Sequence, residues 1–470
     1  MTPKNKPTTK RSNSNNSLLE SLLKYTFAAL LIFIPLYPKF PLFNVPGTYV
    51  AVRAEDFIIA LLALLLLLLL LLRPYFKFFT KSPTAKAILV FWLVAFFATL
   101  SGVFLTKTTP LSLGLLHWAR RVEYTIPFFA GLLLARNKDN LLFFVKLIPL
   151  IALAVFVYGL AQIYLNAPVI STQSAEYSTG IALTLQPGVN LSSTFAGHYD
   201  LATYLTMTLS LSAGLLLLFR RHLPRLLGVT FLLILFWLQL RTGSRIAFGA
   251  TVLSLSLVFL LGKKPLWIIP VFLVAFVGLV NTPSISDRFG NLFDVFKFSR
   301  FQDQVKGLMD SRTQLLIPPL YAADASPSST PKPTPIENKR AIQEDRSTSI
   351  RLDVEWPRAL RALKKNPFFG TGYASISLAT DNDYLRALGE TGLLGFIALI
   401  TIIINIITDL LSNLKKKLSS LERFYSLGTL GLVIGFLIIA TFIDVFEASK
   451  VATLFWMYTG LASGIALKHS

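Results

Sequence analysis

The stretch from Phe57 to Leu72 reads FIIALLALLLLLLLLL and contains no polar residue. An α-helix rises about 1.5 Å per residue, so this run approaches the roughly 30 Å of a bilayer's hydrocarbon core. Its unbroken leucine segment from Leu64 carries no chemistry, which indicates a lipid-facing or packing role. The stretch predicts a membrane-spanning helix.

The whole chain has the same character. Its 470 residues are 53% hydrophobic and only 15% charged, and the mean hydropathy is +0.60, too apolar for an ordinary water-soluble domain. The absence of cysteine excludes disulfide scaffolds, thiolate metal sites and cysteine nucleophiles. A net charge of +21 would suggest nucleic acid in a soluble protein, but in a membrane protein it can reflect topology, so no nucleic-acid partner is expected.

Apolar runs long enough to cross a bilayer recur along the sequence. We predict an all-α polytopic membrane protein with about twelve transmembrane helices. The predicted spans are 25–38, 57–72, 87–105, 113–135, 141–164, 199–219, 226–241, 245–261, 265–280, 387–410, 424–443 and 451–467.

The distribution of Lys and Arg predicts the orientation. With the N-terminus inside, the inner segments hold 22 of these residues and the short outer segments hold six. Positive residues are retained on the cytoplasmic side, so both termini are expected to be cytoplasmic.

The domain organisation follows from these spans. Residues 1–24 are expected to form a basic, disordered cytoplasmic tail rather than a cleaved signal peptide, and 25–280 to hold spans one to nine. Residues 281–386 form a large extracytoplasmic loop with a disordered Pro/Ser linker at 322–335, an aromatic part at 289–309 and an amphipathic helix at 349–365. Residues 387–470 hold the last three spans and a short cytoplasmic tail.

Four arginines lie at the outer side, where the charge rule disfavours them: Arg120, Arg121, Arg241 and Arg245. One interpretation is that they reach the headgroups or pair locally, for example with Glu123. The other is an anion site, because guanidinium groups bind phosphate oxygens in a fork. The hairpin at 242–244 can add backbone N–H groups if it begins a helix, so Arg245 and Arg241 are ranked before the tandem pair.

Among the four histidines, His198 stands at the outer entrance of the sixth span, two residues before Asp200. It is interpreted as a base, a hydrogen-bond partner of a sugar, or an interfacial residue. The sequence has no metal-ligand spacing and no glycine-rich phosphate loop followed by Lys-Ser or Lys-Thr, so ATP-driven transport is not expected.

The most specific stretch lies before the tenth span. It contains NPFFGTGY at 366–373, then Asp381, Asn382, Asp383 and Tyr384, then ETGLLG at 390–395. Asp and Asn at a helix start often cap it, and capping is a sufficient explanation for Asp383. Asp381 lies further out, which makes it the leading general-base candidate.

These motifs together resemble the O-antigen ligase and polymerase family, the WaaL-like and Wzy-like membrane glycosyltransferases of bacterial envelopes. The Asn-Pro-x-x-Gly-x-Gly turn of that family is matched at 366–372. Its His-Asn pair with a later Gly-x-x-Gly is matched by Asn382, Gly392 and Gly395, with Asp381 in the histidine position. Residues 242–245 are similar to its Ser-Arg segment and 193–205 to its sixth-span entrance, so the likeness covers about 110–410.

The resemblance implies a GT-C-like enzyme in the bacterial plasma (inner) membrane, without metal or nucleotide-sugar cofactor. It would transfer a glycan from a polyprenyl-diphosphate carrier, such as undecaprenyl diphosphate, to a hydroxyl of a glycan, lipid or protein acceptor on the outer face. A base would remove the acceptor proton and arginines would offset the leaving-group charge. The implied catalytic residues are Asp381 and Arg245, and the implied substrate-binding residues are Arg120, Arg121, Arg241, Ser244, His198, Asn382 and Tyr384.

Two other classes remain open. A transporter or flippase for lipid-linked oligosaccharide would also place charges along a substrate path, although these charges gather on one face and the halves show no obvious repeat. A structural or signalling protein leaves the arginines without a role. Within the enzyme class, aspartate in the histidine position favours a polymerase-like or divergent member over a ligase.

Overall fold

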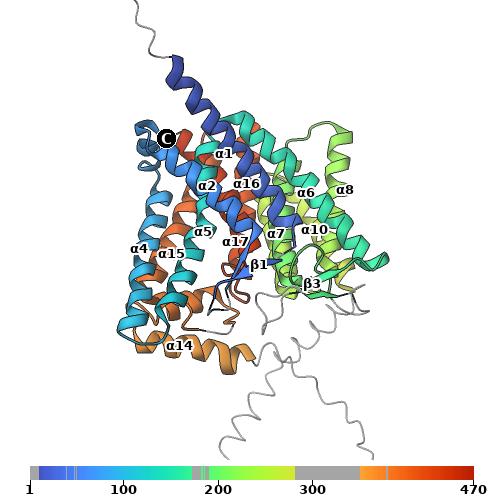
Figure 1. The fold of residues 1–470 in the computed structure, drawn as a ribbon. Coiled ribbons are helices and arrows are strands. Elements are labelled where there is room, and N and C mark those ends of the chain that lie inside the picture. The colour runs from blue at the N-terminus through green and yellow to red at the C-terminus, as the bar shows by residue number, and fades with distance from the viewer. Residues whose placement is uncertain are drawn as a thin grey trace, which may run out of the picture.

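The computed structural model describes residues 10–280 and 350–469, apart from short gaps at 39, 47, 49, 172–180, 184, 186–189 and 377–378. The predicted linker at 322–335 and the aromatic segment at 289–309 lie outside the described residues. The described chain is a bundle of helices whose two ends differ (Figure 1). The first residues of α1 (Lys10–Leu36) and the last residues of α17 (Ser449–Lys468) lie toward one end, and helix α14 (Trp356–Lys365) lies across the other, here called the α14 end.

A helix occupies each of the twelve predicted span positions. They are α1 (Lys10–Leu36), α2 (Ala54–Leu70), α4 (Pro83–Phe104), α5 (Leu111–Leu134), α6 (Lys138–Tyr164), α7 (His198–Leu216), α8 (His222–Arg241), α9 (Arg245–Leu261), α10 (Ile268–Val280), α15 (Asp383–Lys415), α16 (Ser420–Ile439) and α17 (Ser449–Lys468). Within the described residues, six are both long and apolar enough to cross a membrane: α1 from Leu18, α4, α6, α8, α15 and α16. The structure is therefore consistent with a multi-pass membrane protein.

Several elements differ from the prediction. Helix α1 begins at Lys10, so the expectation of disorder is wrong for residues 10–24, where Leu23 is already buried in the core. A short helix, α3 (Arg73–Phe79), follows α2. The all-α expectation also missed two antiparallel hairpins, β1 (Pro41–Asn44) with β2 (Ala51–Arg53) and β3 (Val169–Ser171) with β4 (Ile181–Leu183).

The amphipathic helix predicted at 349–365 is present. It consists of a π-helical turn, η2 (Arg351–Glu355), which continues into α14 and ends at Asn366, before the proline. A 3-10 turn, η1 (Pro265–Trp267), likewise precedes α10.

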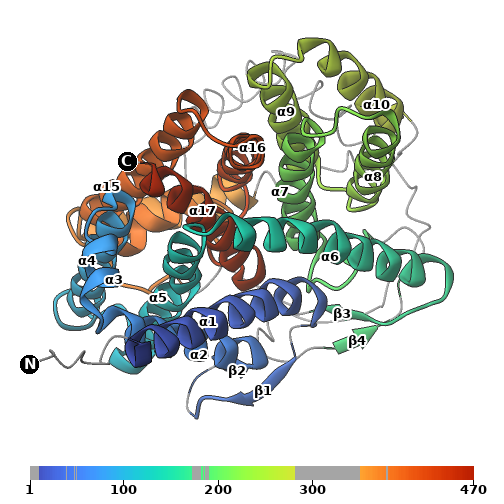
Figure 2. The same cartoon turned by 90° about the horizontal axis from the view of Figure 1, so that it is seen from above.

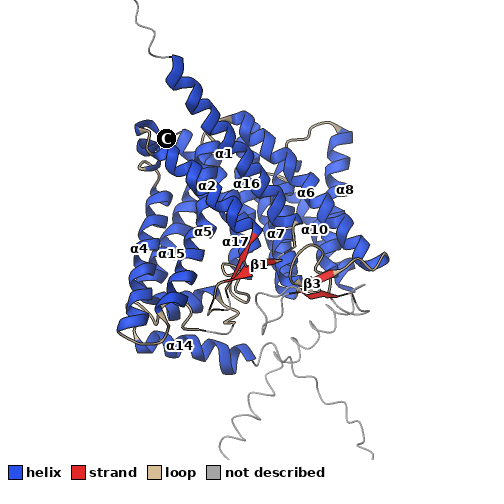
Figure 3. Cartoon of the chain, in the orientation of Figure 1, coloured by secondary structure: helices blue, strands red, loops and turns tan. Residues whose placement is uncertain are grey.

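Helices α5, α7 and α17 form the interior of the bundle. Helix α17 packs against α5, α7 packs against α16 and α9, and α4 packs against α15. All residues of α17 from Ser449 to Ala466 are buried. In the view along the bundle, α7, α8, α9 and α10 form a group beside the remaining helices (Figure 2). The hairpins and α14 both lie at the α14 end (Figure 3).

A break in α15 joins the two glycine motifs. Gly392 has φ 65° and ψ −169°, which interrupts the helical hydrogen bonds. The turn at 367–372 fills the gap, because Leu393 N donates to Pro367 O at 2.8 Å and Gly372 N donates to Glu390 O at 2.8 Å. A Cβ on Gly392 would lie 2.3 Å from Phe368 O, so only glycine allows this approach. The spacing between the turn at 366–372 and the glycines at 392 and 395 is therefore set by the backbone hydrogen bonds that join these two segments.

Candidate functional site

A cavity of about 390 Å³ lies at the α14 end, where five parts of the chain meet. Strand β2, helix α5, the segment leading into α7, the segment leading into α15 and the α16–α17 connection all contribute. Its lining residues include Ala51, Arg53, His117, Arg120, Arg121, Tyr124, Gly197, Tyr199, Asp200, Ile376, Asp381, Arg386, Asp444, Glu447 and Ser449.

The cavity combines both signs of charge. Four arginines line it, at positions 53, 120, 121 and 386, and four carboxylates accompany them, at positions 200, 381, 444 and 447. Three of the nine residues proposed from the sequence are brought together here: Arg120, Arg121 and Asp381. They come from segments about 260 residues apart, so only the tertiary structure brings them together.

Arg120 is held toward β2 and the start of α2. Its Nη2 donates to Ala51 O at 2.9 Å and lies 3.3 Å from Asp56 Oδ2. Asp56 also accepts a hydrogen bond from Arg53 N, which fixes the beginning of α2. Arg120 is therefore held by a strand and a helix that are distant from it in sequence.

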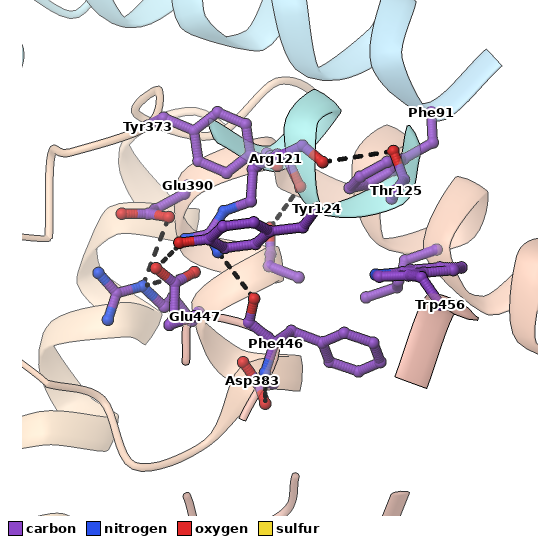
Figure 4. Close-up of a pocket in the computed structure, with 14 residues that line it drawn as sticks. Phe91, Arg121, Tyr124, Thr125, Tyr373, Asp383, Glu390, Phe446, Glu447 and Trp456 are labelled. Carbon is purple, nitrogen blue, oxygen red and sulfur yellow. Dashed lines mark hydrogen bonds and ion pairs between the residues drawn. The ribbon is translucent and has the colours of Figure 1, made fainter. Parts of the chain in front are cut away.

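Arg121 points toward the α16–α17 connection. It forms an ion pair with Glu447, and its Nη1 donates to Phe446 O at 2.9 Å. The guanidinium also lies over the Tyr373 ring, 5.5 Å from its centroid, a cation–π contact. Figure 4 shows these groups around a smaller adjacent cavity of about 60 Å³ that Arg121, Arg386 and Glu447 also line.

Arg386 lies in the second turn of α15 and joins three carboxylates. Its Nη1 is 3.0 Å from Asp444 Oδ2, and its Nε is 3.5 Å from both Glu390 Oε2 and Glu447 Oε1. Its Nη2 donates to Ile376 O. This arginine therefore holds the α16–α17 connection against α15 and stabilises this wall of the cavity.

Asp381 lines the cavity immediately before α15. Its Oδ2 accepts two hydrogen bonds from Arg351, from Nε at 3.0 Å and from Nη2 at 2.8 Å. Its φ of 48° turns the chain between Thr380 and the helix start. Burial raises the pKa of Asp381, and the neighbouring Arg351 partly offsets that rise. The carboxylate is thus a stronger proton acceptor than a free aspartate, although it is held by an arginine.

Lys450 fixes the opposite wall. Its side chain is fully buried, Nζ donates to Thr194 O at 2.8 Å, and the ammonium lies 4.8 Å from the Phe195 ring centroid. The segment at 194–197 is thereby tied to the start of α17. The sequence places Lys450 just before the last predicted span, and no motif marks it.

The hairpin arginines lie elsewhere at the same end. Within the described residues, neither Arg241 nor Arg245 lines the two cavities above. Arg241 lies over the Trp237 ring at 5.9 Å, and Ser244 is buried as the N-cap of α9, where its Oγ accepts from Ala247 N. These residues therefore do not share the two described cavities with Asp381, because α9 begins beside α7 and α8 rather than beside α5.

Three further predicted residues take structural positions. Asn382, and not Asp383, is the N-cap of α15, with its Oδ1 accepting from Leu385 N at 2.9 Å. Tyr384 donates its hydroxyl to Leu437 O at 2.9 Å. His198 begins α7 with its ring 4.1 Å from that of Tyr199, which lines the cavity although His198 does not.

Sequence reasoning missed Arg386, Asp444 and Glu447. A signal was available for Arg386, since it and Glu390 are spaced one helical turn apart at the start of a span. The two carboxylates occupy a short connection with no recognisable motif. Among the residues that the structure describes, no group of three His, Cys, Asp or Glu is arranged to hold a metal ion.

The fold and the site define a helical, multi-pass class of membrane protein with a charged cavity at one end of the bundle. Residues 229–400 match the family model Wzy_C, described as O-antigen ligase. The match confirms the resemblance to the O-antigen ligase and polymerase family for this segment, which covers most of α8, all of α9, α10 and α14, and the first half of α15. No curated protein matches the chain.

Proposed function

We propose that the protein transfers a glycan from a polyprenyl-diphosphate carrier to an acceptor hydroxyl, in the cavity at the α14 end. One observation carries the proposal: Arg120, Arg121 and Asp381 line the same cavity although they are distant in sequence. Anion-binding and proton-accepting groups are both required for such a transfer. The match of residues 229–400 to the O-antigen ligase model supports the same class of chemistry.

The proposed step is a displacement at the anomeric carbon. The acceptor oxygen forms a bond to this carbon while the bond to the diphosphate oxygen breaks. The electron pair of that bond leaves with the polyprenyl diphosphate, whose increased negative charge is stabilised by arginine. Asp381 receives the acceptor's proton. Because Asp381 lines the same cavity as Arg120 and Arg121, the base and the anion-binding groups can act on one bound substrate.

The arginines are assigned different parts in this proposal. Arg121 and Arg120 bind the diphosphate inside the cavity. Arg241 and Arg245, at the hairpin between α8 and α9, contact the donor before it enters the cavity or hold its headgroup at the bundle edge. Arg386 keeps the wall in place, because its charge is already balanced by Asp444 and Glu390.

We further propose that all twelve helices span a bacterial plasma membrane, with both termini cytoplasmic and the α14 end outside. The distribution of Lys and Arg supports this orientation, and the lipid-linked donor would then meet the cavity on the outer face. Aspartate at position 381 favours a polymerase-like or divergent member over a ligase.

A flippase for lipid-linked oligosaccharide is the second candidate. The cavity has four arginines and four carboxylates, so it could bind a zwitterionic or hydrated cargo during transport as well as a substrate during reaction. A transporter, however, needs a path through the bundle, whereas the larger charged cavity lies at the α14 end and α17 is buried along most of its length.

The test is turnover by the purified full chain in proteoliposomes with a polyprenyl-diphosphate-linked glycan. We expect polyprenyl diphosphate to be released only when acceptor is supplied, and Asp381→Asn to slow this by about 10²- to 10⁴-fold, as is typical for loss of a general base. Arg121→Gln is expected to lose most turnover. Arg361→Gln, on the exposed side of α14, is the matched control and retains it.

Unchanged turnover in Asp381→Asn and Arg121→Gln would refute the site. Movement of the intact lipid-linked glycan across sealed vesicles, with no diphosphate released, would favour the flippase instead.

A further inference from the structure

Glu447 has an unusual position between two arginines. It lies in the connection between α16 and α17, and each oxygen of its carboxylate faces a different guanidinium. Oε2 pairs with Arg121 of α5, and Oε1 lies 3.5 Å from Nε of Arg386 of α15. This bridging arrangement is the one that two oxygens of a phosphate group adopt between two arginines.

The two arginines depend on Glu447 to different degrees. Arg386 has two further ion-pair partners, Asp444 and Glu390, and keeps its charge balanced without Glu447. Among the described residues, Glu447 is the one carboxylate that forms an ion pair with Arg121. Movement of Glu447 would therefore release the charge of Arg121 and leave Arg386 in place.

Glu447 is also the partner most open to the cavity. Its side chain is 24% exposed, compared with 2% for Glu390 and 11% for Asp444. It lines both the 390 Å³ cavity and the smaller cavity beside it. A ligand that enters the larger cavity therefore meets Glu447 together with Arg121.

We propose that Glu447 is a displaceable substitute for the donor's phosphate, which it replaces on Arg121 while the cavity is empty. Binding of the diphosphate moves the carboxylate off Arg121, and departure of the polyprenyl diphosphate lets it return. The inference rests on the proposed function and deepens it, because it assigns a regulator to the same anion site.

The physical reason is the cost of leaving charges unpaired. A half-buried guanidinium without a partner is costly, so an internal carboxylate stabilises the empty site. A diphosphate carries more negative charge than a carboxylate and forms more charge-assisted hydrogen bonds, so it displaces Glu447 from Arg121. A neutral or singly charged sugar does not, which makes Glu447 a selectivity element for the diphosphate. The same competition weakens binding of the leaving group and favours its release.

The experiment measures binding of inorganic pyrophosphate to the detergent-solubilised full chain by titration calorimetry. We expect Glu447→Gln to bind at least about fivefold more tightly than the wild type, because the competing anion is lost. Glu447→Asp keeps the charge on a shorter side chain that does not reach both arginines, so its affinity is expected to lie between the two. Thermal unfolding of each variant verifies that it is folded.

Two controls separate displacement from a general charge effect. Asp444→Asn removes the same charge from the same cavity but leaves the Arg121 pair intact, so its affinity gain should be smaller than that of Glu447→Gln. In an Arg121→Gln background, Glu447→Gln should no longer change the affinity.

Equal gains in Asp444→Asn and Glu447→Gln, no gain in Glu447→Gln, or a gain that persists without Arg121 would each overturn the inference. If the wild type transfers glycan while Glu447→Gln binds no tighter, only this inference fails. If neither protein binds pyrophosphate and none releases polyprenyl diphosphate from the lipid-linked glycan, the proposed function fails as well.

Discussion

Asp381 and Glu355 are two carboxyl groups that share the influence of Arg351. Arg351 donates hydrogen bonds from both Nε and Nη2 to Asp381, which leaves Glu355 less well compensated. Burial and the negative charge of Asp381 together raise the pKa of Glu355 to about 7, and Arg351 only partly opposes these effects. Glu355 therefore gains or loses its proton near neutral pH.

This arrangement predicts a pH-dependent stability. In the unfolded chain Glu355 has an ordinary pKa near 4.5, whereas in the folded protein it keeps its proton to about pH 7. The folded state binds more protons between these values, so the free energy of unfolding falls as the pH rises from about 4.5 to about 7. We expect Glu355→Gln to flatten this slope when the unfolding temperature is measured across the interval.

Asp353→Asn is the matched control, because Asp353 is an exposed carboxylate in the same π-helical turn. A slope that stays unchanged in Glu355→Gln, or that Asp353→Asn flattens equally, would contradict the assignment.

At the level of elements, α15 is the part that carries the site. Its break at Gly392 allows the turn at 367–372 to bond to its backbone, and the first turns of the helix hold Arg386 and Glu390 against the α16–α17 connection. The cap residue Asn382 donates its N–H to Asp444 Oδ1 at 3.0 Å, which joins the same two segments again. The start of α15 therefore holds the α16–α17 connection in place as part of the cavity wall.

We expect Gly392→Ala to destabilise the fold. The conformation with φ 65° and ψ −169° is essentially restricted to glycine and costs other residues on the order of 1–3 kcal/mol. The added Cβ would also lie 2.3 Å from Phe368 O, so the turn must move and turnover should fall with stability. Both are measured by thermal unfolding and by release of polyprenyl diphosphate.

Gly249→Ala provides the comparison, since Gly249 lies inside α9 and a Cβ there has nothing within 4 Å. Alanine is a better helix former, so this variant should be unchanged or more stable. Wild-type stability in Gly392→Ala would show that the break is not required.

At the scale of the whole molecule, the orientation in the membrane can be tested directly because the chain has no cysteine. Lys107→Cys places a single thiol between α4 and α5, and Lys263→Cys places one between α9 and η1. With the α14 end outside, an impermeant maleimide should label Lys107→Cys in intact spheroplasts and label Lys263→Cys only after lysis. The reverse pattern would invert the proposed topology.

Local patterns were sufficient to locate most of the helices. Apolar length located the twelve helices, and the Asn-Pro break located the end of α14, because both depend on neighbouring residues. The start of α1 at Lys10 was missed, since composition indicated a tail while packing of Leu23 continues the helix. The hairpins were missed because their strands are three or four residues long.

The sequence by itself determined the class of protein, the helices and the motifs that indicated the O-antigen ligase and polymerase family, since hydropathy and motif spacing are local properties. Only the tertiary structure decided which charges meet. Arg121 pairs with Glu447, and Asp381 pairs with Arg351. Arg121, Glu447 and Asp381 share a cavity with Arg386, whereas Arg241 and Arg245 lie at the hairpin between α8 and α9. The reason is that charges interact over a few ångströms, and those distances are set by which helices pack together rather than by separation along the chain.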